Sequence, residues 1–146
     1  MEKQLMIYEQ AVPVSKDRHK NWSVSAGHDY DFARKINSVP LLVAEFESAA
    51  REYPIIFAKA NNSCEPTAMV GLQETENAFV TAARSWDADY VPAFIRRYPF
   101  VFSKSPDGDT FTLCLDEGFS GCNQDGDGEA LFDNDGETSD YLKRMI

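Results

Sequence analysis

Hydrophobic and polar positions alternate along the chain in short runs that predict strands. Alternation with period two is typical of a strand with one buried face, and proline or glycine interrupts such runs. Runs of this kind cover Gln4–Val14, Trp22–Val24, Pro54–Lys59, Thr67–Gln73 and Ala78–Thr81. The last three follow one another with short polar connections, which indicates an antiparallel meander.

Two longer segments carry apolar residues at helical spacing. Between Pro40 and Tyr53 the apolar positions recur every three or four residues, and Pro54 follows. A second helix is predicted over about Asp87–Tyr98, because aspartates stand near its start, two arginines stand in its last turn and a proline follows. A third helix is predicted to begin at Ser139.

A hairpin is expected from Pro99–Lys104 and Asp109–Asp116, which flank the strong turn sequence Ser105–Gly108. Helices separate the strands too seldom for repeated β–α–β units. We therefore predict an α+β fold, with an antiparallel sheet of about five to seven strands and two or three packed helices. The length of 146 residues and the hydrophobic content of 43% fit a single domain over residues 1–146.

The charge is concentrated in one segment. The chain has 24 acidic and 14 basic residues, and residues 107–140 contain eleven acids and neither lysine nor arginine. This segment accounts for the whole net charge of −10. A nucleic acid requires a surface of the opposite sign, so it is disfavoured as a partner. A cation, another small ligand or a basic protein surface fits better.

The acidic segment also contains the beginning of a calcium-loop pattern. Asn123, Asp125 and Asp127 supply oxygen ligands at the first, third and fifth positions, and Gly128 stands where the loop needs its sharp turn. The twelfth position is Asn134 instead of the required glutamate. Two interpretations stay open: a calcium site of non-standard geometry at the three named residues, or a solvated acidic loop.

Tyr90, Arg96 and Arg97 form the second candidate site. They belong to an aromatic-rich stretch that ends at Phe102, and aromatic residues and arginine are frequent at protein interfaces. The helical and then alternating spacing also fits ordinary core packing, with the arginines at its rim. The three residues are therefore a candidate partner surface.

No pattern along the chain predicts an assembled catalytic site. Phosphate-binding glycine loops and the serine nucleophile elbow are missing from the sequence. Cys114 or Cys122 could meet His19 or His28 in space, and two histidines with a carboxylate could hold iron, but the spacing supports neither arrangement. We therefore predict no catalytic residue and, apart from calcium, no cofactor.

The chain is expected to lie in the cytoplasm. It begins Met1-Glu2-Lys3-Gln4 without the basic and apolar regions of an export signal. Its apolar runs are far shorter than the roughly 18 residues that a membrane span needs, so membrane insertion is not expected. The three cysteines are expected to be reduced, and the sequence leaves the oligomeric state open.

The stretch from Tyr90 to Phe102, YVPAFIRRYPFVF, resembles the signature of the SapC family of bacterial proteins. Further blocks resemble that family in the same order along nearly the whole chain: residues 8–14, 19–22, 37–40, 44–46, 51–57, 113–116 and 131–133. Members of the family are usually longer. The resemblance therefore implies a chain that lacks the family's continuation beyond the helix near Tyr141.

The resemblance also suggests a biological setting. The family takes its name from a surface-layer (S-layer) locus, and relatives lie in gene neighbourhoods with TonB-dependent outer-membrane receptors, cupin-like proteins and halogenase-like proteins. It implies a non-catalytic accessory or binding protein for surface-layer or nutrient-uptake systems, and no catalytic residues come with it. The alternatives are an enzyme or enzyme subunit partnered with halogenase- or oxygenase-like proteins, and a calcium-stabilised interaction module.

Overall fold

The computed structural model describes residues 7–60, 62–105 and 108–146. Packing divides the chain into two compact units. The first unit comprises Met1–Ile7 and His28–Tyr98, and the second comprises Tyr8–Gly27 and Pro99–Ile146. Each unit is therefore built from two separate stretches of chain. The expectation of one domain over 1–146 stays a prediction.

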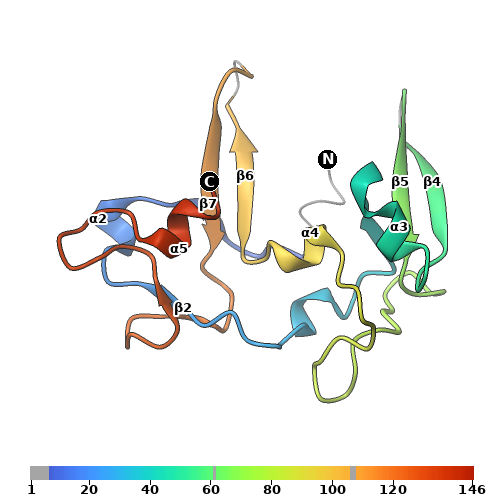
Figure 1. Ribbon diagram of the computed structural model, residues 1–146, viewed down its shortest axis with the longest axis horizontal. Coiled ribbons are helices and arrows are strands. Elements are labelled where there is room, and N and C mark those ends of the chain that lie inside the picture. The colour runs from blue at the N-terminus through green and yellow to red at the C-terminus, as the bar shows by residue number, and fades with distance from the viewer. Residues whose placement is uncertain (1–6, 61, 106–107) are drawn as a thin grey trace. The chain divides into compact units, whose positions relative to one another are not determined.

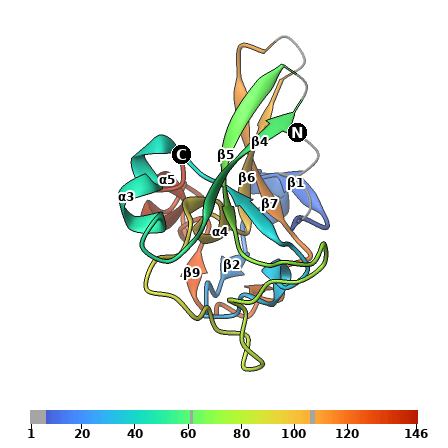
Figure 2. The ribbon, with the colours of Figure 1, turned by 90° about the vertical axis from the view of Figure 1, so that its right-hand side faces the viewer.

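A three-stranded antiparallel sheet in the order β3-β5-β4 forms the framework of the first unit. Its strands are β3 (Ser38–Pro40), β4 (Ile55–Ala60) and β5 (Ser63–Met69). β4 and β5 run side by side as a long hairpin (Figure 2), with Ile55 opposite Ala68. The strand predicted over Pro54–Lys59 is confirmed, whereas that predicted over Thr67–Gln73 begins and ends four residues earlier.

The helices of the first unit are shorter than the sequence predicts. The described elements are two 3₁₀ turns, η1 (Asp31–Ala33) and η2 (Val43–Glu45), and two α-helices, α3 (Phe46–Ala49) and α4 (Ala93–Arg96). In the helix predicted between Pro40 and Tyr53, the first residues extend the sheet instead, because Leu41 donates its backbone N–H to Pro66 (2.9 Å). Tertiary pairing with β5 has overridden local helical spacing.

The predicted helix over Asp87–Tyr98 is reduced to α4 for a different reason. Proline disfavours helical backbone in the residue before it, so Pro92 prevents Val91 from continuing a helix. The carboxylate of Glu52 also binds the backbone N–H groups of Asp89 and Tyr90 at 2.8 and 2.9 Å. The predicted strand Ala78–Thr81 is likewise only a single bridge, between Val80 and Trp86.

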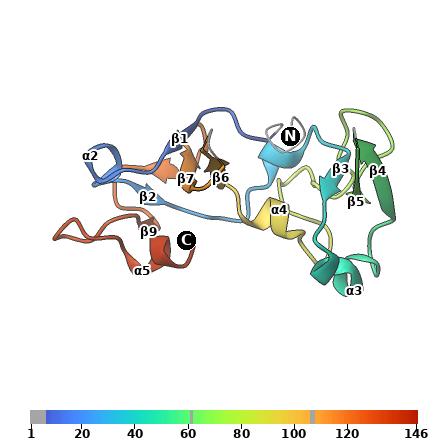
Figure 3. The same cartoon turned by 90° about the horizontal axis from the view of Figure 1, so that it is seen from above.

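The second unit contains a three-stranded antiparallel sheet in the order β1-β7-β6. Its strands are β1 (Ala11–Pro13), β6 (Phe100–Lys104) and β7 (Phe111–Asp116), seen from above in Figure 3. The predicted hairpin is confirmed, with Val101 opposite Cys114, although residues 106 and 107 of its turn lie outside the described residues. Of the predicted opening strand only Ala11–Pro13 is a strand, and Gln4–Met6 lie outside the described residues.

A smaller sheet and two helices complete the second unit (Figure 1). The sheet has the order β8-β2-β9, from Cys122–Asn123, Ser23–Val24 and Glu129–Ala130. The helices are α2 (Lys16–His19) and α5 (Asp140–Lys143). The helix start predicted at Ser139 is confirmed, because its hydroxyl caps α5 by accepting the Leu142 N–H at 3.1 Å.

The α+β class is confirmed, but the described strands form three sheets of three strands instead of one sheet of five to seven. The alternation in the sequence identifies most strand positions. It does not say which strands pair, because pairing is decided by contacts distant in the chain. Among the described residues, no helix is long and apolar enough to cross a membrane.

Candidate functional site

The predicted partner surface lies in the first unit, where Tyr90 is an anchor of the fold. Its hydroxyl donates to Glu45 Oε1 (2.7 Å), and its carbonyl oxygen accepts from the Tyr53 hydroxyl. Burial, followed by the neighbouring Glu45, raises the pKa of Tyr90. Burial also raises the pKa of Tyr53 to about 12. Both phenols are therefore protonated donors at neutral pH.

The two arginines beside Tyr90 differ in their partners. Arg96 is exposed, donates from Nε to the Val91 carbonyl at 2.9 Å, and places its guanidinium 5.7 Å from the centre of the Tyr90 ring. Arg97 lies 4.5 Å from the centre of the Phe94 ring, and its buried Nε and one terminal nitrogen have no hydrogen-bond partner among the described residues. The structure thus joins Tyr90 with Arg96, whereas Arg97 contacts Phe94.

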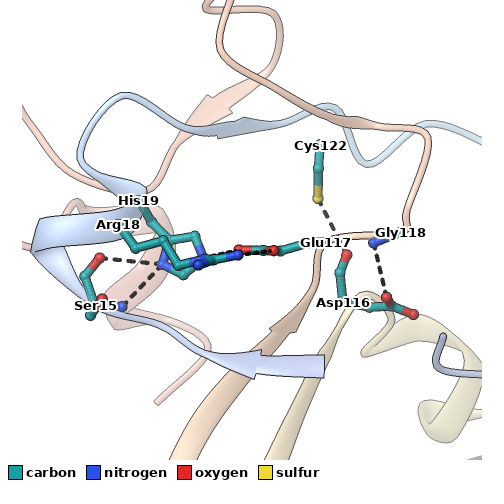
Figure 4. Close-up of polar contacts among 7 residues, drawn as sticks. All are labelled: Ser15, Arg18, His19, Asp116, Glu117, Gly118 and Cys122. Atoms are coloured by element: carbon teal, nitrogen blue, oxygen red, sulfur yellow. Dashed lines mark hydrogen bonds and ion pairs between the residues drawn. The ribbon is translucent and has the colours of Figure 1, made fainter. Parts of the chain in front are cut away.

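A polar cluster in the second unit joins α2 to the end of β7. Arg18 and His19 point towards Glu117, the residue after β7 (Figure 4). Arg18 holds both carboxylate oxygens, with Nε 2.5 Å from Oε1 and its terminal nitrogen 2.7 Å from Oε2. The Arg18 hydrogen bond lowers the pKa of Glu117 and outweighs the opposing effect of burial. Glu117 is consequently ionised at neutral pH.

His19 is completely buried within this cluster. In the tautomer with its proton on Nε2, Nδ1 accepts the Ser15 backbone N–H at 3.1 Å and Nε2 donates to Glu117 Oε1 at 3.1 Å. Trp22 covers the ring edge-on, with the ring centres 5.4 Å apart. Both ring nitrogens are therefore engaged, and the ring has no surface that a substrate could reach.

Asp116, the last residue of β7, fixes the neighbouring backbone. Its side chain is completely buried, and its two carboxylate oxygens accept three backbone N–H groups. The donors are Glu9 (2.8 Å), Gln10 (2.8 Å) and Gly118 (3.0 Å). Asp116 thereby ties the segment before β1 to the turn after β7. Because these hydrogen bonds come from the protein's own backbone, we assign the Asp116 carboxylate a structural role.

The two cysteines of the second unit are poorly placed for nucleophilic chemistry. Burial raises the pKa of Cys114. Burial, with the nearby Asp116 and Glu117, raises the pKa of Cys122 to about 11, and its thiol donates to the Asp116 carbonyl oxygen at 3.5 Å. Because the thiolate is the nucleophile, these environments suppress reactivity at neutral pH.

The loop predicted to bind calcium is shaped by Asn123. The Oδ1 atom of Asn123 accepts the backbone N–H groups of Asp125 and Asp127, both at 3.1 Å, so it already closes the turn. Gly128 has φ +87°, and a Cβ there would lie 2.5 Å from the Val24 carbonyl oxygen, which explains the glycine. Asp125 and Asp127 are exposed. Among the described residues, no group of three His, Cys, Asp or Glu is placed to hold a metal.

A groove of about 400 Å³ lies on one face of the β1-β7-β6 sheet. Val14 donates its N–H to Leu113 at 2.9 Å, and Leu113 is opposite Phe102, so these three residues form a row across the strands. Phe111, two residues before Leu113, is on the same face. Residues of the C-terminal segment, including Phe132, Leu142 and Ile146, complete the lining.

Sequence reasoning missed both the polar cluster and the groove. A signal for the cluster does exist, because the apolar run that begins at Leu113 ends in two consecutive acids, Asp116 and Glu117. Their partners Arg18 and His19 come from about a hundred residues earlier, which no local pattern reveals. Alternation also assigns Phe102 and Phe111 to one strand face, but it cannot say whether that face is covered.

Comparison with protein families identifies the chain. The SapC family model matches residues 14–146, which include the resembling blocks from His19 onwards and the Tyr90–Phe102 signature. No curated protein and no solved structure gives a significant match. Because the family match covers nearly the whole chain, the protein belongs to the SapC family.

Proposed function

We propose that the chain is a non-catalytic accessory protein of the cytoplasm that acts by binding another protein. In this proposal it supports surface-layer systems or outer-membrane nutrient uptake through TonB-dependent receptors, the setting suggested by SapC family membership. One contrast within the second unit carries the proposal. Its histidine is buried with both ring nitrogens hydrogen-bonded and its two cysteines have raised pKa values, whereas large aromatic side chains are exposed along the groove.

The engaged side chains argue against chemistry in the second unit. A general base must come within hydrogen-bond reach of a substrate, but His19 is buried with both ring nitrogens in use. A nucleophilic cysteine needs a lowered pKa, but burial raises the pKa values of both Cys114 and Cys122. His19 and the two cysteines therefore have structural roles in this proposal, and the exposed aromatic side chains form the surface that contacts a partner.

The enzyme alternative has one accessible candidate, because His28 is exposed. An enzyme or enzyme subunit beside oxygenase- or halogenase-like proteins would rely on that ring, on ligands from the acidic loop or on a thiol such as that of Cys122. The alternative of a calcium-stabilised module would rely on Asp125 and Asp127. Each alternative names residues that can be replaced singly, so genetics can separate them from the binding proposal.

Complementation in the native host tests the proposal. A strain lacking the gene is supplied with the wild-type chain or with Cys122→Ser, His28→Ala or Asp125→Ala. The readouts are surface-layer protein at the cell surface and growth on a nutrient taken up by a TonB-dependent receptor. An accessory protein predicts that all three variants restore both readouts, and cell fractionation checks the cytoplasmic location.

Two results would overturn the proposal. One is loss of complementation by Cys122→Ser or His28→Ala at normal protein level, because an enzyme requires its reactive group. The other is turnover by the purified chain that disappears with one of these substitutions. Immunoblotting confirms protein level, and thermal melting of each purified variant confirms that it folds.

A further inference from the structure

The groove of the second unit exposes apolar surface continuous with the protein core. Leu113 and Leu142 at its base are 9% and 2% exposed, whereas Phe102 and Phe111 are 45% and 65% exposed. Ile146 at its end is 76% exposed. Single exposed apolar residues are ordinary on protein surfaces, but a contiguous set around a hollow marks a surface that a partner covers.

A strongly acidic turn adjoins the groove. Phe132 and Thr138 line the groove and bridge to each other, and the chain between them forms the turn. Asp133, Asp135 and Glu137 are exposed on this turn. The Asp133 carboxylate accepts the N–H groups of Asp135 and Glu137 at 3.0 and 2.8 Å, so the turn has a defined shape.

The cation that lines the groove lies against this same turn. A Cβ placed on Gly136 would be 2.4 Å from Lys16 Cε and 2.8 Å from its Nζ, so the lysine side chain crosses over the glycine. The Lys16 side chain thus lies over the turn that carries the three exposed carboxylates. The second unit as a whole has 13 acidic and six basic residues. A ligand in the groove consequently contacts apolar side chains and lies in a region of negative electrostatic potential.

We propose that this groove binds a short segment of a partner protein in which apolar side chains are flanked by lysine or arginine. The inference rests on the proposed binding function and specifies its site and its ligand. The apolar side chains pack on Leu113 between Phe102 and Phe111, and the basic side chains face Asp135 and Glu137. Nucleic acids and anionic lipid surfaces carry the wrong charge for such a turn.

Fluorescence anisotropy with labelled peptides tests the proposal. Three short fluorescein-labelled peptides alternate leucine with lysine, leucine with glutamate, and serine with lysine. The first has both required features, and each of the others lacks one of them. We expect the leucine–lysine peptide to bind with an affinity that falls with added salt, and the other two to bind much more weakly.

Variants of the protein assign this binding to the groove. Phe111→Ser should weaken binding of the leucine–lysine peptide by at least about tenfold, and Phe102→Ser should act in the same direction. The double variant Asp135→Asn with Glu137→Gln should weaken binding and flatten its salt dependence. Phe57→Ser is the matched control, because Phe57 is 63% exposed on β4 of the first unit and lies outside the groove.

The outcomes separate this inference from the proposed function. Equal peptide affinity in Phe111→Ser and Phe57→Ser would overturn the groove as the site, and equal binding of both lysine peptides would reduce the interaction to charge alone. Sedimentation velocity showing a dimer that Phe111→Ser dissociates would assign the groove to a second copy instead. If complementation succeeds as expected but these tests fail, the accessory function stands and its partner binds elsewhere.

Discussion

The two ends of β7 differ more than any local sequence pattern suggests. At its N-terminal end Phe111 is 65% exposed and belongs to the groove, whereas Leu115 and Asp116 at the other end are completely buried. The strand is only six residues long and pairs with β6 from Phe111 to Leu115. A single strand therefore joins a fixed, hydrogen-bonded base to an open apolar surface.

The difference shows how stability and binding can be separated along one element. Leu115 packs in the core, and Asp116 organises three backbone N–H groups, so substitutions there act on folding. The Phe111 side chain is exposed to solvent, so substitutions there should change the binding of a partner more than the stability of the fold.

Replacing Asp116 with alanine should produce the largest loss of stability. The substitution leaves three part-buried backbone donors without their charged acceptor, and each lost hydrogen bond of this kind costs about 1–3 kcal/mol. We expect the free energy of unfolding to fall by about 3 kcal/mol or more, measured by urea denaturation. Asp116→Asn keeps the side-chain shape and one acceptor and should lose less. Equal stability of Asp116→Ala and wild type would contradict the anchoring role.

A matched pair on one face of β7 measures the contrast directly. Leu115→Ala removes a fully buried side chain and should cost about 2–5 kcal/mol, whereas Phe111→Ala should change stability by no more than about 0.5 kcal/mol. Urea denaturation of both variants gives the two values. A cost for Phe111→Ala close to that of Leu115→Ala would show that the groove end is part of the core.

Glu117→Gln should give a smaller effect that depends on pH. Because Arg18 lowers the folded-state pKa of Glu117, the carboxylate stabilises the fold above its unfolded pKa of about 4.3. That contribution is lost as the pH falls through the lower folded-state value. Near neutral pH we expect the variant to melt a few degrees below wild type.

The pH dependence of Tm supplies the check on this interpretation. The difference in Tm between wild type and Glu117→Gln should shrink as the pH falls below about 4.3, because the Glu117 carboxylate then becomes protonated in the unfolded state and, at lower pH, in the folded state as well. Arg18→Gln should reproduce part of the effect, since it removes the bidentate partner. A difference that stays constant from neutral to acidic pH would contradict a role for the ionised pair.

Calcium should have the smallest effect. The amide oxygen of Asn123 already accepts two backbone N–H groups, so we expect the Tm of the purified chain to be unchanged by calcium or by chelator. Any ligand that binds only the folded state must raise Tm. A calcium-specific increase that disappears in Asp125→Ala is what the calcium-loop prediction requires, and it would decide in favour of that site.

The sequence predicts local features well where neighbouring residues determine them. The hairpin of β6 and β7 and the cap of α5 at Ser139 follow from turn chemistry and capping, which act within a few residues. The predicted helices fail where distant groups intervene. Leu41 donates its backbone N–H to the Pro66 carbonyl oxygen, and the Glu52 carboxylate accepts backbone N–H groups of the segment before α4.

The candidate site was harder to predict than the fold class. A binding groove depends on which apolar side chains stay exposed to solvent after the chain has folded. The sequence identifies the acidic segment, and its exposed turn adjoins the groove through Phe132 and Thr138. It gives no sign that Leu115 is covered while Phe111 is exposed, since both occupy equivalent alternate positions. Tyr90 is hydrogen-bonded to Glu45 and Glu52, and its role in a partner surface stays a prediction.

The distribution of thiols has a practical consequence for spectroscopy. All three cysteines are free, and Cys64 on β5 is exposed whereas Cys114 and Cys122 are not. At neutral pH a maleimide dye should therefore attach at Cys64, because burial raises the pKa values of the other two. Cys64 belongs to the first unit and does not line the groove. The native sequence thus accepts a site-selective fluorophore that leaves the groove open to unlabelled partners.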